Sequence, residues 1–227
     1  MTELTLTSGG RRLDANLVVP EGITSGAGLL FVHGLGSNQQ GYLERAGAAA
    51  DELGCTCLTF DLSGHGASDG HLSELFVGDH LTDVVAAYDT LAAQRSVEPE
   101  RIGVSGASYG AYLAGHLIAT RPVARLLLRA PALYDDGAVD LPLRGLHRTR
   151  RMPEADEFLG ALGRYEHEVL VVESERDETI PHRIVQRYLD ALTRGQHRVV
   201  LGADHALIEQ RWRAEFRRIV IDWFRPL

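Results

Sequence analysis

Short apolar segments alternate with longer amphipathic segments along most of this chain. The continuous apolar runs 29–32 and 126–128 are typical of strands that are buried on both faces of a sheet. The segment 79–94 carries apolar residues at helical spacing, and 41–53 is rich in alanine and ends before a glycine, so both predict helices. Further strands are predicted at 55–60, 102–104, 169–172 and 198–201, and further helices at 109–119, 183–192 and 207–224. This alternation predicts a mostly parallel sheet with helices on both faces.

Two stretches depart from this alternation. The segments 4–7 and 13–19 alternate apolar and polar residues, which predicts an antiparallel pair of strands at the start of the sheet. Between residues 131 and 165 no strand pattern occurs, and an insertion of this length in a compact domain is typically a lid or a loop that holds a helix. We therefore expect a single α/β domain over 1–227, with a twisted sheet of about eight strands and a small cap at about 132–165.

The composition narrows the possible chemistry. All 23 basic residues are arginines, because the chain contains no lysine, and this excludes Schiff-base lysine chemistry and phosphate-binding loops that need a lysine. The net charge of −8 argues against a general nucleic-acid binder. No apolar run reaches the roughly 18 residues of a membrane span, and residues 1–7 lack the features of a signal peptide.

The two cysteines, Cys55 and Cys57, lie in one predicted strand with a single residue between them. This spacing places them on the same face and too far apart for an easy disulfide, so we expect small, buried core residues. Two cysteines do not make a usual metal site, and neither a metal nor an organic cofactor is expected. Unpaired cysteines favour a reducing, cytoplasmic location.

The strongest chemical signal is the sequence Gly106-Ala107-Ser108-Tyr109-Gly110, between a predicted strand and a predicted helix. In this context the serine lies on a sharp turn with its hydroxyl raised above the sheet, and the glycines let neighbouring backbone approach closely. The pattern alone is weak in a chain with 24 glycines. The surrounding strand, turn and helix make Ser108 the expected nucleophile.

A serine nucleophile needs a base, and the base needs a group that orients it. His205 follows the predicted strand 198–201, and Asp177 follows the predicted strand 169–172. The chain order Ser108, Asp177, His205 is the order expected for such a site. Asp204 is adjacent to His205, and adjacent loop residues rarely face each other, so Asp177 is the expected orienting acid.

Two backbone N–H groups should stabilise the oxyanion that forms when the serine attacks a carbonyl. One is that of Tyr109, directly after the nucleophile, and the other is that of Leu35, in the loop 33–36 after the first parallel strand. His33 is expected to hold this loop, and His65 to shape the rim of the site.

Over essentially its whole length the chain resembles the α/β-hydrolase superfamily. The segments FVHGLGSN (31–38), FDLSGHGASDG (60–70) and GADH (202–205) resemble those of small feruloyl/cinnamoyl-type carboxylesterases. The resemblance implies a serine carboxylesterase that works through an acyl-enzyme, without a cofactor. Its expected partner is a small-molecule ester, not a nucleic acid or a membrane, and the protein is expected to be a monomer or a homodimer.

Two alternatives stay open. The sequence around Ser108 also resembles that of prolyl-oligopeptidase-like hydrolases, so an amidase or peptidase with the same residues is possible. A non-catalytic hydrolase-fold protein that binds a ligand or a partner is the alternative of another class.

The substrate pocket is less well defined by the sequence. Tyr134 and Leu133 follow the predicted strand 126–128, and they either line the acyl or alcohol pocket or pack in the core. Arg148 and Arg151 belong to an arginine-rich part of the insertion, and arginine binds carboxylates and phosphates through two N–H groups. They either bind an anionic substrate or form a solvated face of a chain in which arginine is the only long cation.

Overall fold

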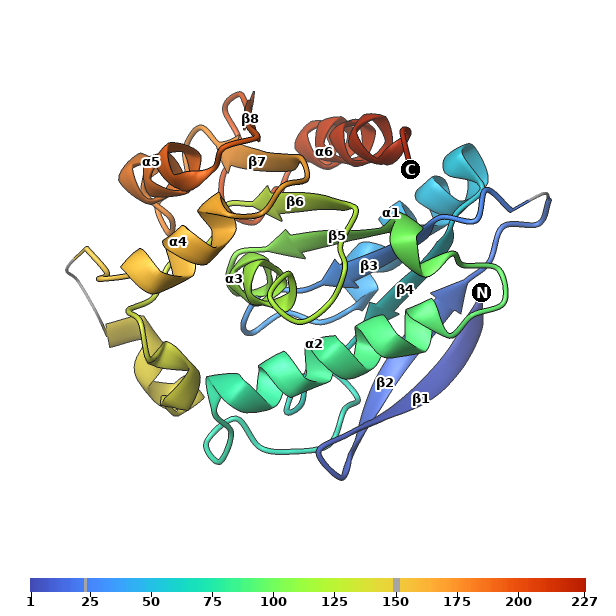
Figure 1. The fold of residues 1–227 in the computed structure, drawn as a ribbon, viewed down its shortest axis with the longest axis horizontal. Helices are drawn as coiled ribbons and strands as arrows, with labels where there is room; N and C mark the ends of the chain where they lie inside the picture. The colour runs from blue at the N-terminus through green and yellow to red at the C-terminus, as the bar shows by residue number, and fades with distance from the viewer. Residues whose placement is uncertain (23, 149–151) are drawn as a thin grey trace.

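Eight strands form one sheet in the computed structural model, which describes residues 1–22, 24–148 and 152–227 (Figure 1). The strand order is β1-β2-β4-β3-β5-β6-β7-β8. β2 pairs antiparallel with β1 and with β4, whereas every other pairing is parallel, so the predicted antiparallel opening pair and mostly parallel sheet are confirmed. The strands are β1 (Thr2–Ser8), β2 (Arg11–Val18), β3 (Gly28–Val32), β4 (Thr56–Phe60), β5 (Ile102–Ala107), β6 (Arg125–Arg129), β7 (Val169–Ser174) and β8 (Gly195–Val200).

Helices cover both faces of the sheet. Strand side chains point alternately to opposite sides, so the apolar strands present buried residues on each face. On one face, Leu30 and Val32 of β3 share a core with α2, α3, α4 and α5. On the other face, Leu29 and Phe31 share a second core with α1 and α6. Among the described residues no helix combines the length and apolar character that crossing a membrane requires. The helices are α1 (Gln40–Leu53), α2 (Val77–Ala92), α3 (Tyr109–Leu117), α4 (Asp156–Gly163), α5 (His182–Ala191) and α6 (Gln210–Phe224), with short 3₁₀ helices η1 (Pro99–Arg101), η2 (Ala138–Asp140) and η3 (Leu143–Arg148).

Two predicted boundaries differ from the structure near the C-terminus. β8 begins at Gly195 rather than at residue 198, because it is an edge strand whose residues are mostly exposed and carry little apolar pattern. α6 begins at Gln210 rather than at residue 207. Leu207 has φ of 53°, a left-handed conformation that does not continue into a right-handed helix.

Cys55 and Cys57 are free and buried, as predicted. Their Sγ atoms lie 3.6 Å apart, and the Cys55 thiol contacts the Ala49 carbonyl of α1 at 3.3 Å. Burial raises the pKa of the Cys57 thiol well above its usual value. Both side chains therefore act as small core residues between β4 and α1.

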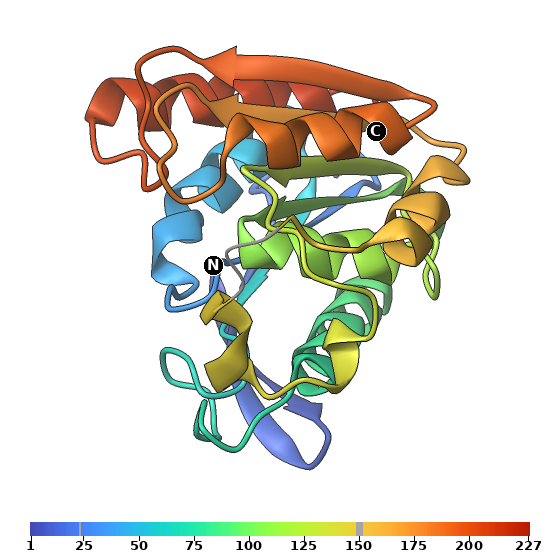
Figure 2. The same cartoon turned by 90° about the vertical axis from the view of Figure 1, so that its left-hand side faces the viewer.

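The segment between β6 and β7 has no strand in its described part, in agreement with the prediction, and contains η2, η3 and α4. Backbone hydrogen bonds join it to the start of α2. The Leu143 N–H donates to the Leu75 carbonyl at 2.9 Å, and the Val77 N–H donates to the Leu141 carbonyl at 3.1 Å. Figure 2 shows these short helices, in yellow, beside α2. The segment proposed as a cap thus packs against the N-terminal end of α2.

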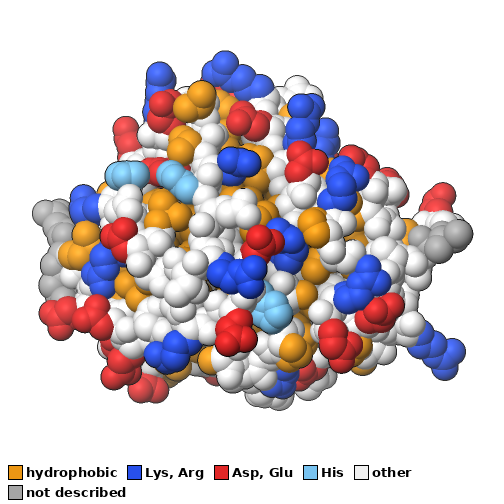
Figure 3. Space-filling view, turned by 45° about the horizontal axis from the view of Figure 1, so that its top comes forward, with side chains coloured by type: hydrophobic (Ala, Val, Ile, Leu, Met, Phe, Trp, Pro, Cys, Tyr) orange, Lys and Arg blue, Asp and Glu red, His pale blue; other side chains and the backbone are white. Residues whose placement is uncertain are grey.

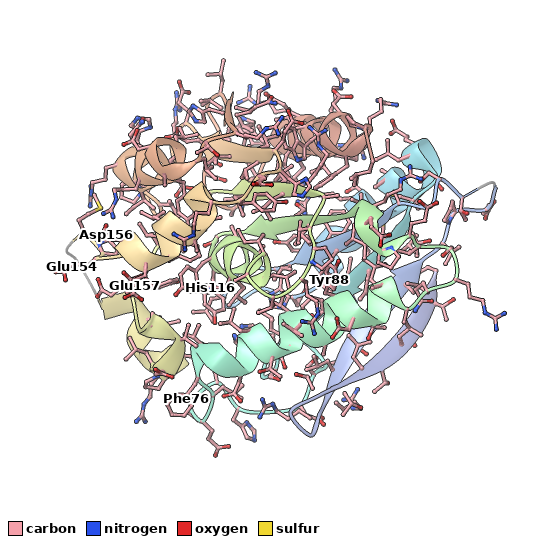
Figure 4. All side chains as sticks on the ribbon, viewed as in Figure 1. Phe76, Tyr88, His116, Glu154, Asp156 and Glu157 are labelled. Carbon is pink, nitrogen blue, oxygen red and sulfur yellow. The ribbon has the colours of Figure 1, made fainter. Side chains whose placement is uncertain are left out.

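The N-terminal end of α4 carries three carboxylate side chains, those of Glu154, Asp156 and Glu157 (Figure 4). The N–H groups of this first turn have no partner within the helix. The Asp136 carboxylate accepts two of them, from Glu157 at 2.9 Å and from Phe158 at 3.1 Å. Asp136, in the loop between β6 and η2, therefore caps this helix.

We expect an Asp136→Ala substitution to lower the free energy of unfolding by about 1 kcal/mol, because the first turn of α4 loses its acceptor. Urea unfolding measures this change. Asp140→Ala is the matched control, since Asp140 lies in the same segment and is exposed, and its side chain accepts no hydrogen bond among the described residues. Equal losses in the two variants would contradict the capping role.

Candidate active site

Ser108 lies on a strained turn between β5 and α3. Its φ of 54° and ψ of −118° are rare for a residue with a side chain. The turn is tight because glycines flank it. A Cβ at Gly106 would lie 2.4 Å from the Gly110 carbonyl oxygen, and a Cβ at Gly110 would lie 2.4 Å from the Val32 and His33 carbonyl oxygens. Only glycine fits at either position, and the turn raises Ser108 at the carboxyl end of the sheet.

Asp177 and His205 come from the loops that follow β7 and β8, and the structure brings them together. Nδ1 of His205 lies 2.7 Å from Oδ2 of Asp177, while Oδ1 accepts the Thr179 and Ile180 N–H groups at 2.9 and 2.7 Å. Burial alone would raise the pKa of Asp177, but the hydrogen bonds from His205, Ile180 and Thr179 outweigh it and lower the pKa. A carboxylate at this position keeps the proton of His205 on Nδ1 and leaves Nε2 free to accept one.

Asp204, the neighbour of His205, faces elsewhere. Its Oδ1 accepts the Ile208 N–H at 3.2 Å within the loop that leads to α6. The carboxylate that contacts the His205 ring is thus that of Asp177.

The N–H groups of Leu35 and Tyr109 donate no hydrogen bond to any described residue. Both lie close to Ser108, since Tyr109 follows it directly and the loop 33–36 lies against it. A Cβ at Gly34 would be 3.4 Å from the Cβ of Ser108 and 3.3 Å from the Ala107 carbonyl oxygen. Two unused donors beside a serine hydroxyl make a favourable place for a developing oxyanion.

Two buried histidines hold the loop 33–36. Nδ1 of His33 donates to the Gly34 carbonyl at 2.8 Å, while Nε2 accepts the Leu62 N–H at 3.0 Å. Nε2 of His65 accepts the Gly36 N–H at 3.1 Å. A ring nitrogen that accepts carries no proton, so both rings are neutral in this arrangement. Burial favours the same state, since it lowers the pKa of His33 to about 4 and also lowers the pKa of His65.

His80 of α2 completes this group, and the sequence analysis did not single it out. Its Nε2 donates to the Ser63 carbonyl at 2.9 Å, and its Nδ1 accepts the Tyr109 hydroxyl at 3.1 Å. Burial lowers the pKa of His80 to about 4. One feature of the sequence could have identified it. His80 lies on the apolar face of the helix, between Val77 and Val84, where a buried histidine needs hydrogen-bond partners.

Ser108 and His205 line one cavity of about 330 Å³ together with Leu35. Three arginine side chains, those of Arg45, Arg129 and Arg213, also line it. The sequence analysis missed them, because they lie far apart in the chain and outside the arginine-rich insertion.

Leu133 and Tyr134 lie beside the site but do not line this cavity. Leu133 is buried, and the Tyr134 ring packs against the rings of Tyr109 and Tyr112 at centroid distances of 6.0 and 4.9 Å. The structure places both in the core under the predicted cap. The predicted anion contacts of Arg148 and Arg151 lie outside the described residues, because the former's side chain and the whole of the latter are not described.

Comparison with known proteins identifies relatives of the chain. Residues 29–164 match the model of a family described as the alpha/beta hydrolase family. A protein of Mycobacterium tuberculosis, Rv2307c, is 31% identical over 184 residues, which is 80% of this chain, and the chain spans 63% of that protein's length. The mitochondrial palmitoyl-protein thioesterase ABHD10 of Rattus norvegicus is 32% identical over 116 residues, which is 49% of this chain and 36% of the rat protein.

Solved structures share the whole fold at low sequence identity. Est1E from Butyrivibrio proteoclasticus, solved with ferulic acid bound, has a TM-score of 0.76 at 17% identity, over 98% of this chain and 96% of Est1E. An alpha-beta serine hydrolase homologue from Coxiella burnetii has a TM-score of 0.73 at 20% identity, over 97% and 96% of the two chains. These likenesses confirm the predicted α/β-hydrolase fold.

The neutral histidines predict a pH-dependent stability. Unfolded histidine titrates near pH 6.5, whereas the pKa of His33 and of His80 in the folded protein is about 4. Below pH 6.5 the unfolded chain therefore binds protons that the folded protein does not. We expect the free energy of unfolding to fall by about 1.4 kcal/mol per pH unit for each of these histidines as the pH drops from 6.5 to 4.

Urea unfolding across this pH range measures the slope. Replacing one of the two histidines, as in His80→Gln, should make the slope shallower, whereas His71→Gln at an exposed turn should leave it unchanged. A His80→Gln slope equal to that of the unaltered protein would show that His80 does not stay neutral in the fold.

Proposed function

The chain belongs to the alpha/beta hydrolase family, and we propose that it is a serine hydrolase that cleaves small carboxylic esters through an acyl-enzyme on Ser108. The observation that carries this proposal is the 2.7 Å contact between Asp177 and His205 at the edge of the cavity that Ser108 lines. Nucleophile, base and orienting acid come from three different strand ends of one sheet. Such an arrangement serves acyl transfer.

In the proposed first step, Nε2 of His205 takes the proton of the Ser108 hydroxyl while Oγ attacks the ester carbonyl carbon. The carbon–oxygen double bond opens, and its electron pair moves onto the carbonyl oxygen. Asp177 holds the Nδ1–H of His205 and stabilises the imidazolium that results.

The oxyanion then accepts hydrogen bonds from the backbone N–H groups of Leu35 and Tyr109. A preorganised donor of this kind is worth about 3 kcal/mol of transition-state stabilisation in other hydrolases. The hydrogen bonds of His33 and His65 keep the Leu35 loop in place, so the donors need no rearrangement when charge develops.

His205 next gives its proton to the leaving alcohol oxygen as the ester bond breaks, which leaves an acyl group on Ser108. A water molecule repeats the attack with His205 as base, and the acid product leaves with Ser108 restored. Each cycle consumes one ester and one water and yields one acid and one alcohol.

Thioesters and amides are the substrates against which this proposal must be tested. The rat relative is a palmitoyl-protein thioesterase, and Ser108, Asp177 and His205 also suit a thioester bond. An amide needs stronger protonation of a poorer leaving group. Measuring kcat/KM for matched ester, thioester and amide substrates ranks the three classes. Faster cleavage of the amide than of the ester would replace the proposal with the amidase alternative.

Labelling by a fluorophosphonate probe tests the nucleophile. We expect one label per chain, at Ser108, because only an activated serine reacts rapidly with such a probe. Ser108→Ala should abolish it, whereas Ser105→Ala, in the preceding strand, should not. Absence of labelling in the unaltered protein contradicts the serine hydrolase, and labelling that survives Ser108→Ala contradicts the assigned residue.

Replacing the orienting acid tests the remainder of the arrangement. Asp177→Asn should lower kcat by about 10⁴-fold, because the amide no longer keeps the His205 proton on Nδ1. The matched control is Asp204→Asn, next to the base, for which we expect little change in kcat. A larger loss in Asp204→Asn than in Asp177→Asn would exchange their roles.

A further inference from the structure

Three arginine side chains from distant parts of the sequence meet at the cavity beside Ser108. Arg45 comes from α1, Arg129 from the end of β6 and Arg213 from α6. None of the three lies within salt-bridge distance of a carboxylate among the described residues. Nη1 of Arg45 donates to the Gly41 carbonyl, and Nη1 of Arg213, which is exposed, donates to the Leu207 and Ile208 carbonyls. The cavity thus gathers positive charge that no carboxylate of the described residues neutralises by direct contact.

Arg129 is the most buried of the three, with 9% of its surface exposed. Its Nη1 donates to the His205 backbone carbonyl at 2.8 Å, and its other guanidinium nitrogens have no partner in the part of the chain that the structure describes. Burial lowers the pKa of Arg129, and the nearby charges of Asp177 and Asp204 offset this only in part. An anion that approached the free guanidinium nitrogens would compensate more of the cost of burying this cation.

Arg45 lies with its guanidinium over the rings of Tyr42 and Phe216, 5.0 and 5.2 Å from their centroids. The guanidinium of Arg129 lies 5.8 Å from the same Phe216 ring, which places the two cations on one aromatic side chain. Burial is the main cause that lowers the pKa of Arg45; Arg129 and Arg213 act in the same direction, whereas Tyr42 and Glu44 act against it. Arg45 is therefore repelled by both of the other cations.

Some arginines elsewhere on the surface lie next to carboxylates. Figure 3 shows arginine side chains interspersed with aspartate and glutamate on the face that it presents. Arg121 lies 2.6 Å from Asp89, and Arg217 of α6 pairs with Glu44 of α1. Exposed arginines such as Arg218 also form no ion pair among the described residues, so the cavity arginines are distinguished by their convergence beside Ser108 rather than by the lack of a partner.

We propose that Arg45, Arg129 and Arg213 bind an anionic group of the substrate, a carboxylate or a phosphate, close to the bond that Ser108 attacks. The inference rests on the proposed function and narrows its substrates to esters or thioesters that carry such a group. Guanidinium groups bind these oxyanions with paired N–H donors, and they do so most strongly where water is partly excluded.

The cavity also argues against a long apolar acyl chain at this position. Its volume of about 330 Å³ suits a small group, and three guanidinium groups at its wall leave a methylene chain without matching contacts. The inferred substrate is therefore short and charged, in contrast to a palmitoyl group.

A binding experiment tests the pocket independently of catalysis. Calorimetry with Ser108→Ala protein should detect binding of glutarate or of inorganic phosphate, and Arg45→Gln or Arg213→Gln in that background should weaken it by about 10-fold or more. Arg218→Gln is the matched control, because Arg218 lies exposed on α6 and does not line the cavity. Tighter binding of glutarate assigns carboxylate substrates, and tighter binding of phosphate assigns phosphorylated ones.

Absence of binding to either anion, or equal weakening by Arg218→Gln, overturns the inference. Anion binding that requires Arg45 and Arg213 in a protein that no fluorophosphonate labels would retain the pocket and reject the proposed hydrolase. The two proposals can therefore fail separately.

Turnover provides the second measurement. The nitrophenyl ester of glutaric acid should be cleaved with a higher kcat/KM than the uncharged nitrophenyl pentanoate, and Arg45→Gln and Arg213→Gln should remove about 10-fold of that preference. Arg218→Gln should keep it. Equal losses for the charged and the uncharged ester would mean that the arginines only support the fold.

Discussion

The site depends on one close contact between backbones, where the first turn of α3 meets the end of β3. At Gly110 the carbonyl oxygens of Val32 and His33 occupy the space that any side chain would need. A larger residue would push α3, and Ser108 with it, away from the sheet. The same contact sets the loop 33–36 beside Ser108, so a single packing distance fixes both the hydroxyl and the two unused N–H donors.

Three neutral imidazole rings also stabilise the backbone around the site. His33, His65 and His80 each donate one hydrogen bond to a backbone carbonyl and accept another. Such rings rigidify a loop without placing charge beside it, and this suits the proposed oxyanion site. His205, which is partly accessible, contacts a carboxylate instead. Histidine thus occurs in two settings at this site. The buried rings have backbone partners and support the loop, whereas the more accessible ring of His205 has a carboxylate partner.

The sequence was sufficient for features that local pattern determines. The strands and helices, the turn at Ser108 and the positions of Asp177 and His205 after β7 and β8 all follow from apolar periodicity and chain order. It was insufficient where side chains converge from distant elements. Arg45, Arg129 and Arg213 give no local signal, since one lies in a helix, one ends a buried strand and one lies in the last helix.

Arg129 contacts the backbone of both Ser108 and His205. Its carbonyl accepts the Ser108 N–H at 2.8 Å, while its guanidinium donates to the His205 carbonyl at 2.8 Å. Thermodynamic linkage makes such a connection reciprocal: a ligand that binds the guanidinium more tightly when His205 is in place stabilises that position of His205 by the same free energy. An anion in the cavity would then act as a removable structural element, and occupancy of the pocket would itself tighten the alignment between Ser108 and His205.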